Sequence, residues 1–220
     1  MTGRFMKPRR AISHFGGFAF TELLVVIAVV LLAAVFGYAY FSRAKIKNQS
    51  VCCNCNLKQV GLAFRLWGDD NGAYPMRFRT NNFDGPSFAI QGKMYVYFQV
   101  MSNELNTPTI LMCPSDNRTP APNFIDFGND NVSYFVGLDA DEIVPQMFLA
   151  GDRNLMVNGV PASPGLMVIK APDSIGWTPQ WHQGRGNVVL ADGSVQGYAL
   201  SGLQQALRHT GTNVNRLAIP

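Results

Sequence analysis

Four cysteines are the residues of this sequence most suited to covalent or metal chemistry. Cys52, Cys53 and Cys55 lie close together, and Cys113 follows much later, directly before a proline. Adjacent Cys52 and Cys53 cannot readily pair with each other, and Cys52-x-x-Cys55 lacks the histidine that follows it in haem-attachment motifs. A zinc site would need a second pair of ligands, and only Cys113 is available. We therefore expect one disulfide between this cluster and Cys113, with the remaining thiols free.

His182 and Asp192 suggest a second kind of chemistry, metal binding or acid-base catalysis. Asp192 and Gly193 stand between two runs, Asn187 to Ala191 and Ser194 to Tyr198. This pattern predicts a hairpin with a two-residue type I′ turn, in which Asp192 is the first turn residue. His182 lies in a glycine-containing stretch that predicts a loop, so we expect structural roles for both. The sequence contains no Ser-His-Asp nucleophile motif, P-loop or dinucleotide fingerprint, which argues against an enzyme.

The chain before the cysteine cluster contains a long apolar segment. Between Phe18 and Phe41 the only charged residue is Glu22, and the rest is long enough, at about 1.5 Å per residue, to cross the roughly 30 Å hydrocarbon core of a bilayer. Four basic residues precede the segment and account for the whole net charge of +4. The remainder of the chain is neutral and has no basic stripe that would bind nucleic acid.

Glu22 is the feature of this segment that needs explaining. A carboxylate at the edge of an apolar helix costs about 2.5–3.5 kcal/mol to insert, so it should have a positive partner. Cleavage after Gly17 would create an α-amine on Phe18, one helical turn from Glu22, and the amine of a neighbouring subunit would serve equally. An ordinary signal peptide is disfavoured, because the segment offers only a poor small-x-small site near Gly37.

The stretch from Phe15 to Glu22 resembles the prepilin signature of type IV pilin-like proteins and type II secretion pseudopilins: a basic leader ending in glycine, a phenylalanine, and a glutamate before an unbroken apolar helix. The resemblance implies that a prepilin peptidase cleaves between Gly17 and Phe18 and methylates the new amine. It also implies that Glu22 sets the register of subunits in a filament. The alternative is a plain signal anchor. One departure from the family is Ala39, where many members carry a proline.

Beyond the apolar segment, the residues Leu57, Val60, Phe64 and Trp67 follow helical spacing and predict an amphipathic stem. The stem should end at the turn residues Gly68 to Gly72. The predicted organisation is a leader (1–17), a transmembrane and assembly helix (18–41), a stem helix (42–68) and a head (69–220).

In the head, short apolar runs predict strands near Met94–Val100, Val132–Val136 and Gln146–Leu149, and Ser201 is predicted to cap a helix over Leu203–Arg208. The expected fold class is α+β, with a pilin-like long N-terminal helix packed against a small antiparallel sheet.

The head also resembles a large group of pseudopilin-like proteins, most of which have no assigned role. The resemblance rests on a cysteine three residues before Asn56, on Cys113-Pro-Ser-Asp, on Gly151-Asp-Arg-Asn, and on His182 followed after nine residues by Asp192-Gly193. It implies a disulfide between Cys53 and Cys113. The role of the motif formed by His182, Asp192 and Gly193 is unknown.

Because major pseudopilins often hold calcium in a head loop, the resemblance also suggests Ca²⁺ as a cofactor. The oxygen-rich stretches Asp126–Asn131 and Asp139–Glu142 are the candidates, although neither has EF-hand spacing.

Together these features predict a structural pseudopilin subunit of a type II secretion-like periplasmic filament. Its implied partners are the prepilin peptidase, other copies and minor pseudopilins, and an inner-membrane assembly platform. Its implied location is the bacterial inner membrane, with a single span and a periplasmic C-terminal head. The alternatives are a subunit of a type IV pilus or DNA-uptake filament, and a membrane-anchored module whose His182 and Asp192 capture a metal or a glycan.

Overall fold

The computed structural model describes residues 20–220, except for the side chains at positions 39, 43, 44 and 46. The protein is α+β over this range, with a long apolar N-terminal helix and an antiparallel sheet domain, so the coarse fold prediction is confirmed. The chain divides into two compact units with the boundary after Arg43. The second unit, from Ala44 onward, is called the head unit below.

The helices are α1 (Phe20–Asn71), α2 (Gly85–Ile90), α3 (Val96–Gln99), α4 (Ser102–Leu105) and α5 (Leu200–His209), with 3₁₀ turns at Pro108–Leu111 and Asn129–Asn131. The strands are β1 (Tyr134–Gly137), β2 (Phe148–Asp152), β3 (Leu155–Val157), β4 (Val160–Pro161), β5 (Gly165–Lys170), β6 (Ile175–Trp177), β7 (Gly186–Leu190), β8 (Val195–Tyr198) and β9 (Val214–Ile219).

Helix α1 ends inside the predicted cluster of turn residues, three residues beyond the stem range 42–68. The helix continues to Asn71, and the N–H of Gly72 still donates to the carbonyl of Gly68 at 2.7 Å. Gly68 therefore lies inside the last turn of α1. An isolated glycine lowers helix propensity but does not by itself end a helix.

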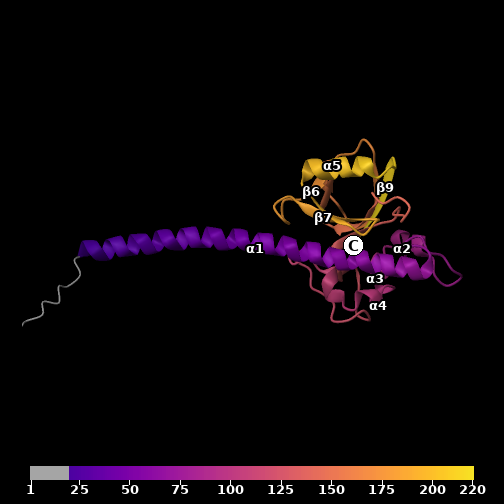
Figure 1. Ribbon diagram of the computed structural model, residues 1–220, viewed down its shortest axis with the longest axis horizontal. Coiled ribbons are helices and arrows are strands. Elements are labelled where there is room, and N and C mark those ends of the chain that lie inside the picture. The colour runs from indigo at the N-terminus through magenta and orange to yellow at the C-terminus, as the bar shows by residue number, and fades with distance from the viewer. Residues whose placement is uncertain (1–19) are drawn as a thin grey trace, which may run out of the picture. The chain divides into compact units, whose positions relative to one another are not determined.

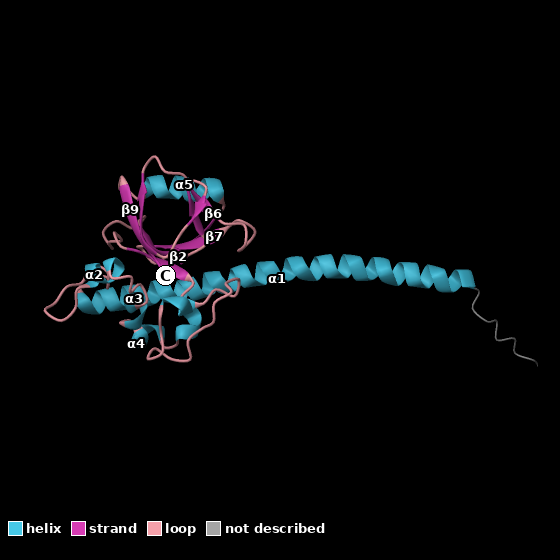
Figure 2. Ribbon diagram, turned by 180° about the vertical axis from the view of Figure 1, so that it is seen from behind, coloured by secondary structure: helices cyan, strands magenta, loops and turns pink. Residues whose placement is uncertain are grey.

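The part of α1 in the head unit forms the centre of the larger hydrophobic core. Leu57, Val60 and Phe64 are completely buried and follow the spacing that predicted the stem, and Trp67 is 8% exposed. In Figure 1 this part of α1 runs between the sheet with α5 and the segment with α3 and α4; Figure 2 shows the same order from behind. The C-terminal part of α1 is therefore an integral part of the core of the head unit.

The main sheet has six strands in the order β5-β9-β1-β2-β7-β8, and every neighbouring pair is antiparallel. Consecutive residues of a strand contact different cores, as the pleat requires. On β1, Tyr134 and Val136 belong to the core that contains α1, whereas Phe135 belongs to a second core with α5. A small sheet in the order β4-β3-β6 completes the second core.

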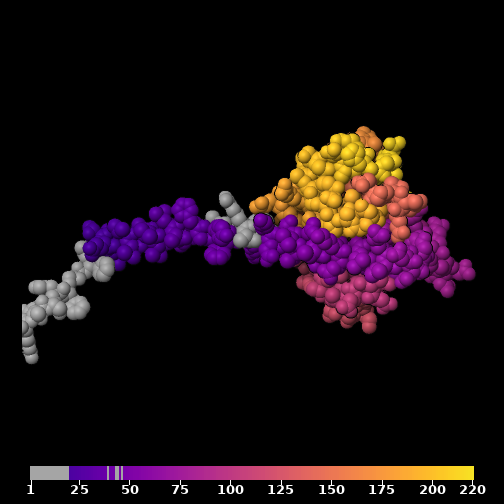
Figure 3. All heavy atoms as spheres, in the orientation of Figure 1, coloured from indigo at the N-terminus to yellow at the C-terminus, as the bar shows by residue number. Residues whose placement is uncertain are grey.

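In the head unit, the part of the chain that holds α3 and α4 lies on the side of α1 opposite α5, where Figure 3 shows its magenta to pink surface. The strand predicted near Met94–Val100 is wrong, because α3 occupies this stretch. Its buried residues Met94, Tyr97, Phe98 and Met101 have helical spacing, so the period of the apolar residues distinguishes helix from strand here better than their aromatic content does.

The predicted hairpin between β7 and β8 is present, but the predicted turn type is wrong. The Gly193 N–H donates to the carbonyl of Leu190, and the Leu190 N–H donates to the carbonyl of Ser194, both at 2.9 Å. Only Gly193 (φ 82°) has a positive φ, whereas a type I′ turn needs a positive φ at both central residues. The loop therefore has three residues and ends in a glycine bulge.

The predicted helix near the C-terminal hairpin is present as α5, but its predicted cap is wrong. Ala199 holds the N-cap position and Ser201 lies inside the first turn.

Candidate functional site

Two regions carry the residues that the sequence singled out for function. The first is the N-terminal part of α1, where Glu22 lies in the first helical turn. The large apolar side chains described from Leu23 to Phe41 are exposed, and this helix is long and apolar enough to span a membrane. The predicted processing site, Gly17 and Phe18, lies outside the described residues.

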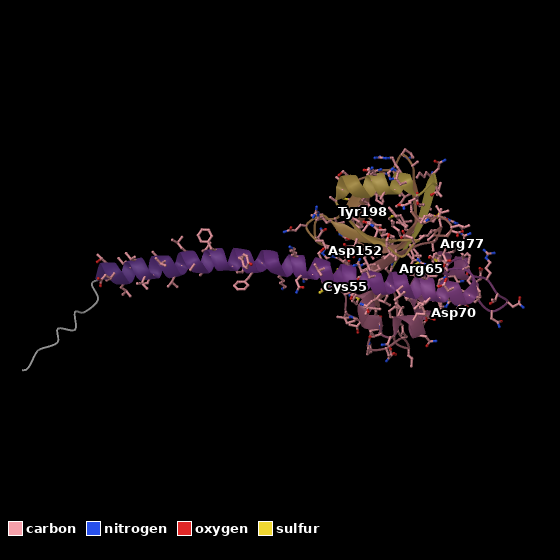
Figure 4. The ribbon with its side chains drawn as sticks, viewed as in Figure 1. Cys55, Arg65, Asp70, Arg77, Asp152 and Tyr198 are labelled. Carbon is pink, nitrogen blue, oxygen red and sulfur yellow. A yellow bond between two sulfur atoms is a disulfide. The ribbon has the colours of Figure 1, made fainter. Side chains whose placement is uncertain are left out.

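The second region is a buried cluster in the head unit that begins with a disulfide. Cys53 on α1 is bonded to Cys113, the pairing that the family resemblance implied. Both cysteines are buried, whereas the free Cys52 and Cys55 are exposed. The bridge fixes α1 to the segment that leads into β1. Cys55, two residues after Cys53 in α1, is labelled in Figure 4.

His182 packs directly on this disulfide. Its Nε2 lies 3.3 Å from the Cys113 sulfur and 3.8 Å from a carboxylate oxygen of Asp152, and its Nδ1 lies 3.4 Å from the Ser115 hydroxyl. The His182 side chain is 1% exposed, and burial lowers the pKa of its imidazole. Its backbone has a φ of 47°, which is uncommon for a residue other than glycine. His182 therefore is a neutral, tightly held ring in the interior.

Asp152, at the end of β2, supplies the carboxyl group of the cluster and is completely buried; Figure 4 labels it. Its Oδ2 accepts hydrogen bonds from the backbone N–H of Asn187 at 2.7 Å and from the side-chain amide of Asn187 at 2.9 Å. Its Oδ1 accepts no hydrogen bond from the described protein groups. Burial raises the pKa of Asp152 to about 7, although the bonds from Asn187 favour the ionised form.

Next to the cluster, Asp116 and Arg153 form an ion pair. The Arg153 guanidinium donates to both oxygens of Asp116, at 2.9 and 2.7 Å, and the Ser133 hydroxyl donates to the same carboxylate at 2.8 Å. Burial alone would raise the pKa of Asp116, but these hydrogen bonds outweigh it and hold the pKa below its usual value. Arg153 also lies 5.0 Å from the ring centroid of Trp181. Arg153 therefore joins the head motif Gly-Asp-Arg-Asn to the motif Cys-Pro-Ser-Asp through two hydrogen bonds to Asp116.

The structure places His182 and Asp192 in different settings. Asp192 remains in the exposed hairpin loop, where its Oδ1 accepts from the N–H of Ser194 at 2.8 Å and its carbonyl accepts from Arg65 at 2.8 Å. The carboxylate beside His182 belongs instead to Asp152. The structural role predicted for Asp192 agrees with these contacts, apart from the turn type.

In the two stretches suggested for calcium, three acidic residues have other partners. Asp139 forms an ion pair with Arg216, and Asp141 forms one with Arg77. Asp126 bonds to the Asn123 side chain at 3.3 Å. Among the described residues, the set of side chains placed to share an ion lies elsewhere: Cys53, Cys113, Asp152 and His182 each offer a ligand atom, and these atoms lie within 4.8 Å of one another.

Sequence reasoning missed Asp152 as a partner of the cysteines and His182. The four residues come from distant parts of the chain, so their spacing carries no signal. The motif Gly-Asp-Arg-Asn drew attention to this stretch, but nothing in it marks Asp152 as a neighbour of His182. The arrangement does not form a proton relay, because Cys113 and Asp152 both face the same nitrogen of His182.

The head unit therefore contains a disulfide, an ion pair between Asp116 and Arg153, and a buried group of side chains that can bind a metal. Comparisons with protein-family models, with curated proteins and with solved structures found no match for this chain.

Proposed function

We propose that the protein is a structural subunit of a pseudopilin-type filament, anchored in the membrane and assembled through the N-terminal part of α1. The observation that carries the proposal is the change of character along this single helix. From Leu23 to Phe41 it is apolar on every side and its described side chains are exposed, whereas from Cys53 onward only one stripe is apolar and buried.

An exposed helix that is apolar on every side needs lipid or other apolar helices around it. A bilayer supplies the first, and the corresponding helices of other subunits supply the second. The prepilin-like sequence around Gly17 supports assembly over simple anchoring, because an anchor has no need for a glutamate at the edge of its apolar segment.

Glu22 has the central role in this proposal. In the first turn of a helix a carboxylate also interacts favourably with the helix dipole, which is worth about 0.3–1 kcal/mol. The helix dipole would stabilise a glutamate at this position in any helix, whether or not the protein assembles. The proposal assigns Glu22 a second task, pairing with the N-terminal amine that cleavage creates on Phe18, on the same or a neighbouring subunit.

The experiment that tests the proposal is Glu22→Ala in the native host, with Thr21→Ala as the matched control in the same turn. We expect Glu22→Ala to reach the membrane fraction at a normal level but to yield no crosslinked or sheared multimers, while Thr21→Ala assembles normally. Multimers of Glu22→Ala at the level of the unchanged protein would refute the proposal and favour an anchored binding module.

A second measurement tests the processing step. Mass spectrometry of the purified protein should find an N-terminus at methylated Phe18. An N-terminus at Met1 would contradict cleavage. Secretion filaments, surface pili and DNA-uptake filaments share this step, and the loss of one of these activities on gene deletion would distinguish them.

A further inference from the structure

We propose that Cys53, Cys113, Asp152 and His182 form a tetrahedral zinc site when the two cysteines are reduced. The disulfide and the zinc site are then two alternative ways of closing the same link between α1 and the rest of the head unit. This inference goes beyond the filament role, since a subunit could assemble without binding a metal.

The ligand set is the first argument. Zinc is bound in proteins by cysteine sulfur, histidine nitrogen and carboxylate oxygen, and two thiolates, one imidazole and one carboxylate make a complete four-coordinate shell. All four residues are buried, with Asp152 and Cys53 at 0% exposure. The exposed Cys52 and Cys55 do not belong to the group.

The distances fit a single small ion. In a tetrahedral zinc site with ordinary bond lengths, neighbouring ligand atoms lie roughly 3.3 to 3.8 Å apart. The Cys113 sulfur lies 3.3 Å from His182 Nε2, that nitrogen lies 3.8 Å from Asp152, and all four ligand atoms lie within 4.8 Å of one another. In a zinc site the two sulfurs would lie about 1.7 Å farther apart than in a disulfide bond. Rotation of the cysteine side chains after reduction can provide this separation.

The surroundings orient the ligands as they would around a metal. Ser115 faces Nδ1 of His182, which leaves Nε2 directed at the sulfurs, and Asn187 holds Asp152 by two hydrogen bonds. Such partners fix ligand geometry in metal sites. The second, independent observation is the Oδ1 of Asp152, which is buried and accepts no hydrogen bond from any group in the described range. A polar atom left in this state is costly unless a ligand compensates it.

A surface pocket is lined by the chain neighbours of two of the ligands. These neighbours are Arg153 and Trp181, which adjoin Asp152 and His182 in the chain, and Asp116 also lines the pocket. The switch from disulfide to zinc site needs a two-electron reductant, which in the test below is a phosphine, with water supplying the two protons and the oxygen atom of the phosphine oxide. Reduction adds two electrons and two protons to the disulfide and yields two thiols, and zinc binding then releases those two protons.

The test uses the full chain in detergent with Cys52→Ser and Cys55→Ser, so that Cys53 and Cys113 are the remaining thiols. After reduction by a phosphine, cobalt(II) is added as a spectroscopic probe and then displaced by zinc. We expect one cobalt per chain with the visible bands of tetrahedral coordination and thiolate charge transfer. We expect the oxidised form of the same chain to bind none.

Matched variants decide between this site and simple dithiol binding. His182→Gln and Asp152→Asn should weaken zinc binding by about tenfold or more, whereas Asp192→Asn, in the exposed loop, should not change it. Equal affinity in His182→Gln, or equal binding by the oxidised chain, would overturn the proposal. If reduction alone unfolds the head, zinc should restore its tryptophan fluorescence, and failure to restore it would also count against the site.

Discussion

Asp152 makes the stability of the head depend on pH in a direction opposite to that of most carboxylates. Its pKa is raised to about 7 in the folded protein, because the side chain is completely buried, against 3.8 for an exposed aspartate. Between these values the folded chain holds a proton that the unfolded chain has released. Its contribution to stability is therefore fully present below pH about 4 and is lost as the pH rises through about 7.

The variant that isolates this effect is Asp152→Asn. Asparagine can still accept the bonds from Asn187 but does not titrate. Each unit of pKa shift corresponds to about 1.36 kcal/mol, so a shift of about 3 units is worth about 4 kcal/mol. We expect the unfolding free energy of the unchanged protein, minus that of Asp152→Asn, to fall by about 4 kcal/mol between pH 4 and pH 8. His182 and Asp116 are present in both proteins, so the part of their titration that does not depend on Asp152 cancels in this difference.

The assay is urea unfolding of the oxidised full chain in detergent, followed by tryptophan fluorescence. All three tryptophans, Trp67, Trp177 and Trp181, lie in the head unit, so the signal reports the head. A difference that rises with pH would mean that Asp152 is ionised and paired with a protonated His182. That result, or a flat difference, would refute the reasoning from burial.

Three further predictions use the same unfolding assay at pH 7. Arg153→Ala leaves a buried carboxylate without its main partner and should cost about 3 kcal/mol, while Arg153→Lys should recover only part of this loss. Gly137→Ala places a Cβ only 1.7 Å from a strand carbonyl and should cost about 3 kcal/mol; Gly197→Ala, whose Cβ would meet its nearest neighbour at 3.5 Å, is the control and should change stability little. Cys113→Ala opens a link across 60 residues and should cost about 4 kcal/mol, whereas Cys55→Ser, at an exposed free thiol, should cost almost nothing; equal losses in both cysteine variants would contradict a stabilising bridge.

The parts of the fold that follow from local pattern could be predicted from the sequence. The stem helix, the β7–β8 hairpin and the α5 helix each follow from apolar spacing or turn residues within a short stretch. The same reasoning misjudged α3, because the aromatic residues of Tyr95–Phe98 favour strands in general while their spacing along the chain is helical. It also assigned no strand to β5 and β9, whose pairing depends on residues far apart in the chain.

The candidate site was predicted only where a single motif carried the information. Cys113 was singled out by residue type, and His182 was considered together with Asp192, which follows it after nine residues in the chain. The hairpin keeps Asp192 at the surface, and the end of β2 brings Asp152 to the interior instead. Long-range pairing of strands decides this choice, and no local pattern in the sequence records it.

The position of β9 has a consequence for how the protein can be made. This strand follows all others along the sequence, yet it lies between β5 and β1 inside the main sheet. A ribosome builds the chain from its N-terminus, so the sheet cannot close until Val214–Ile219 has been synthesised. Until then β5 has no partner in this sheet and β1 lacks one of its two neighbours, so a chain that stops short of β9 exposes two unpaired strand edges.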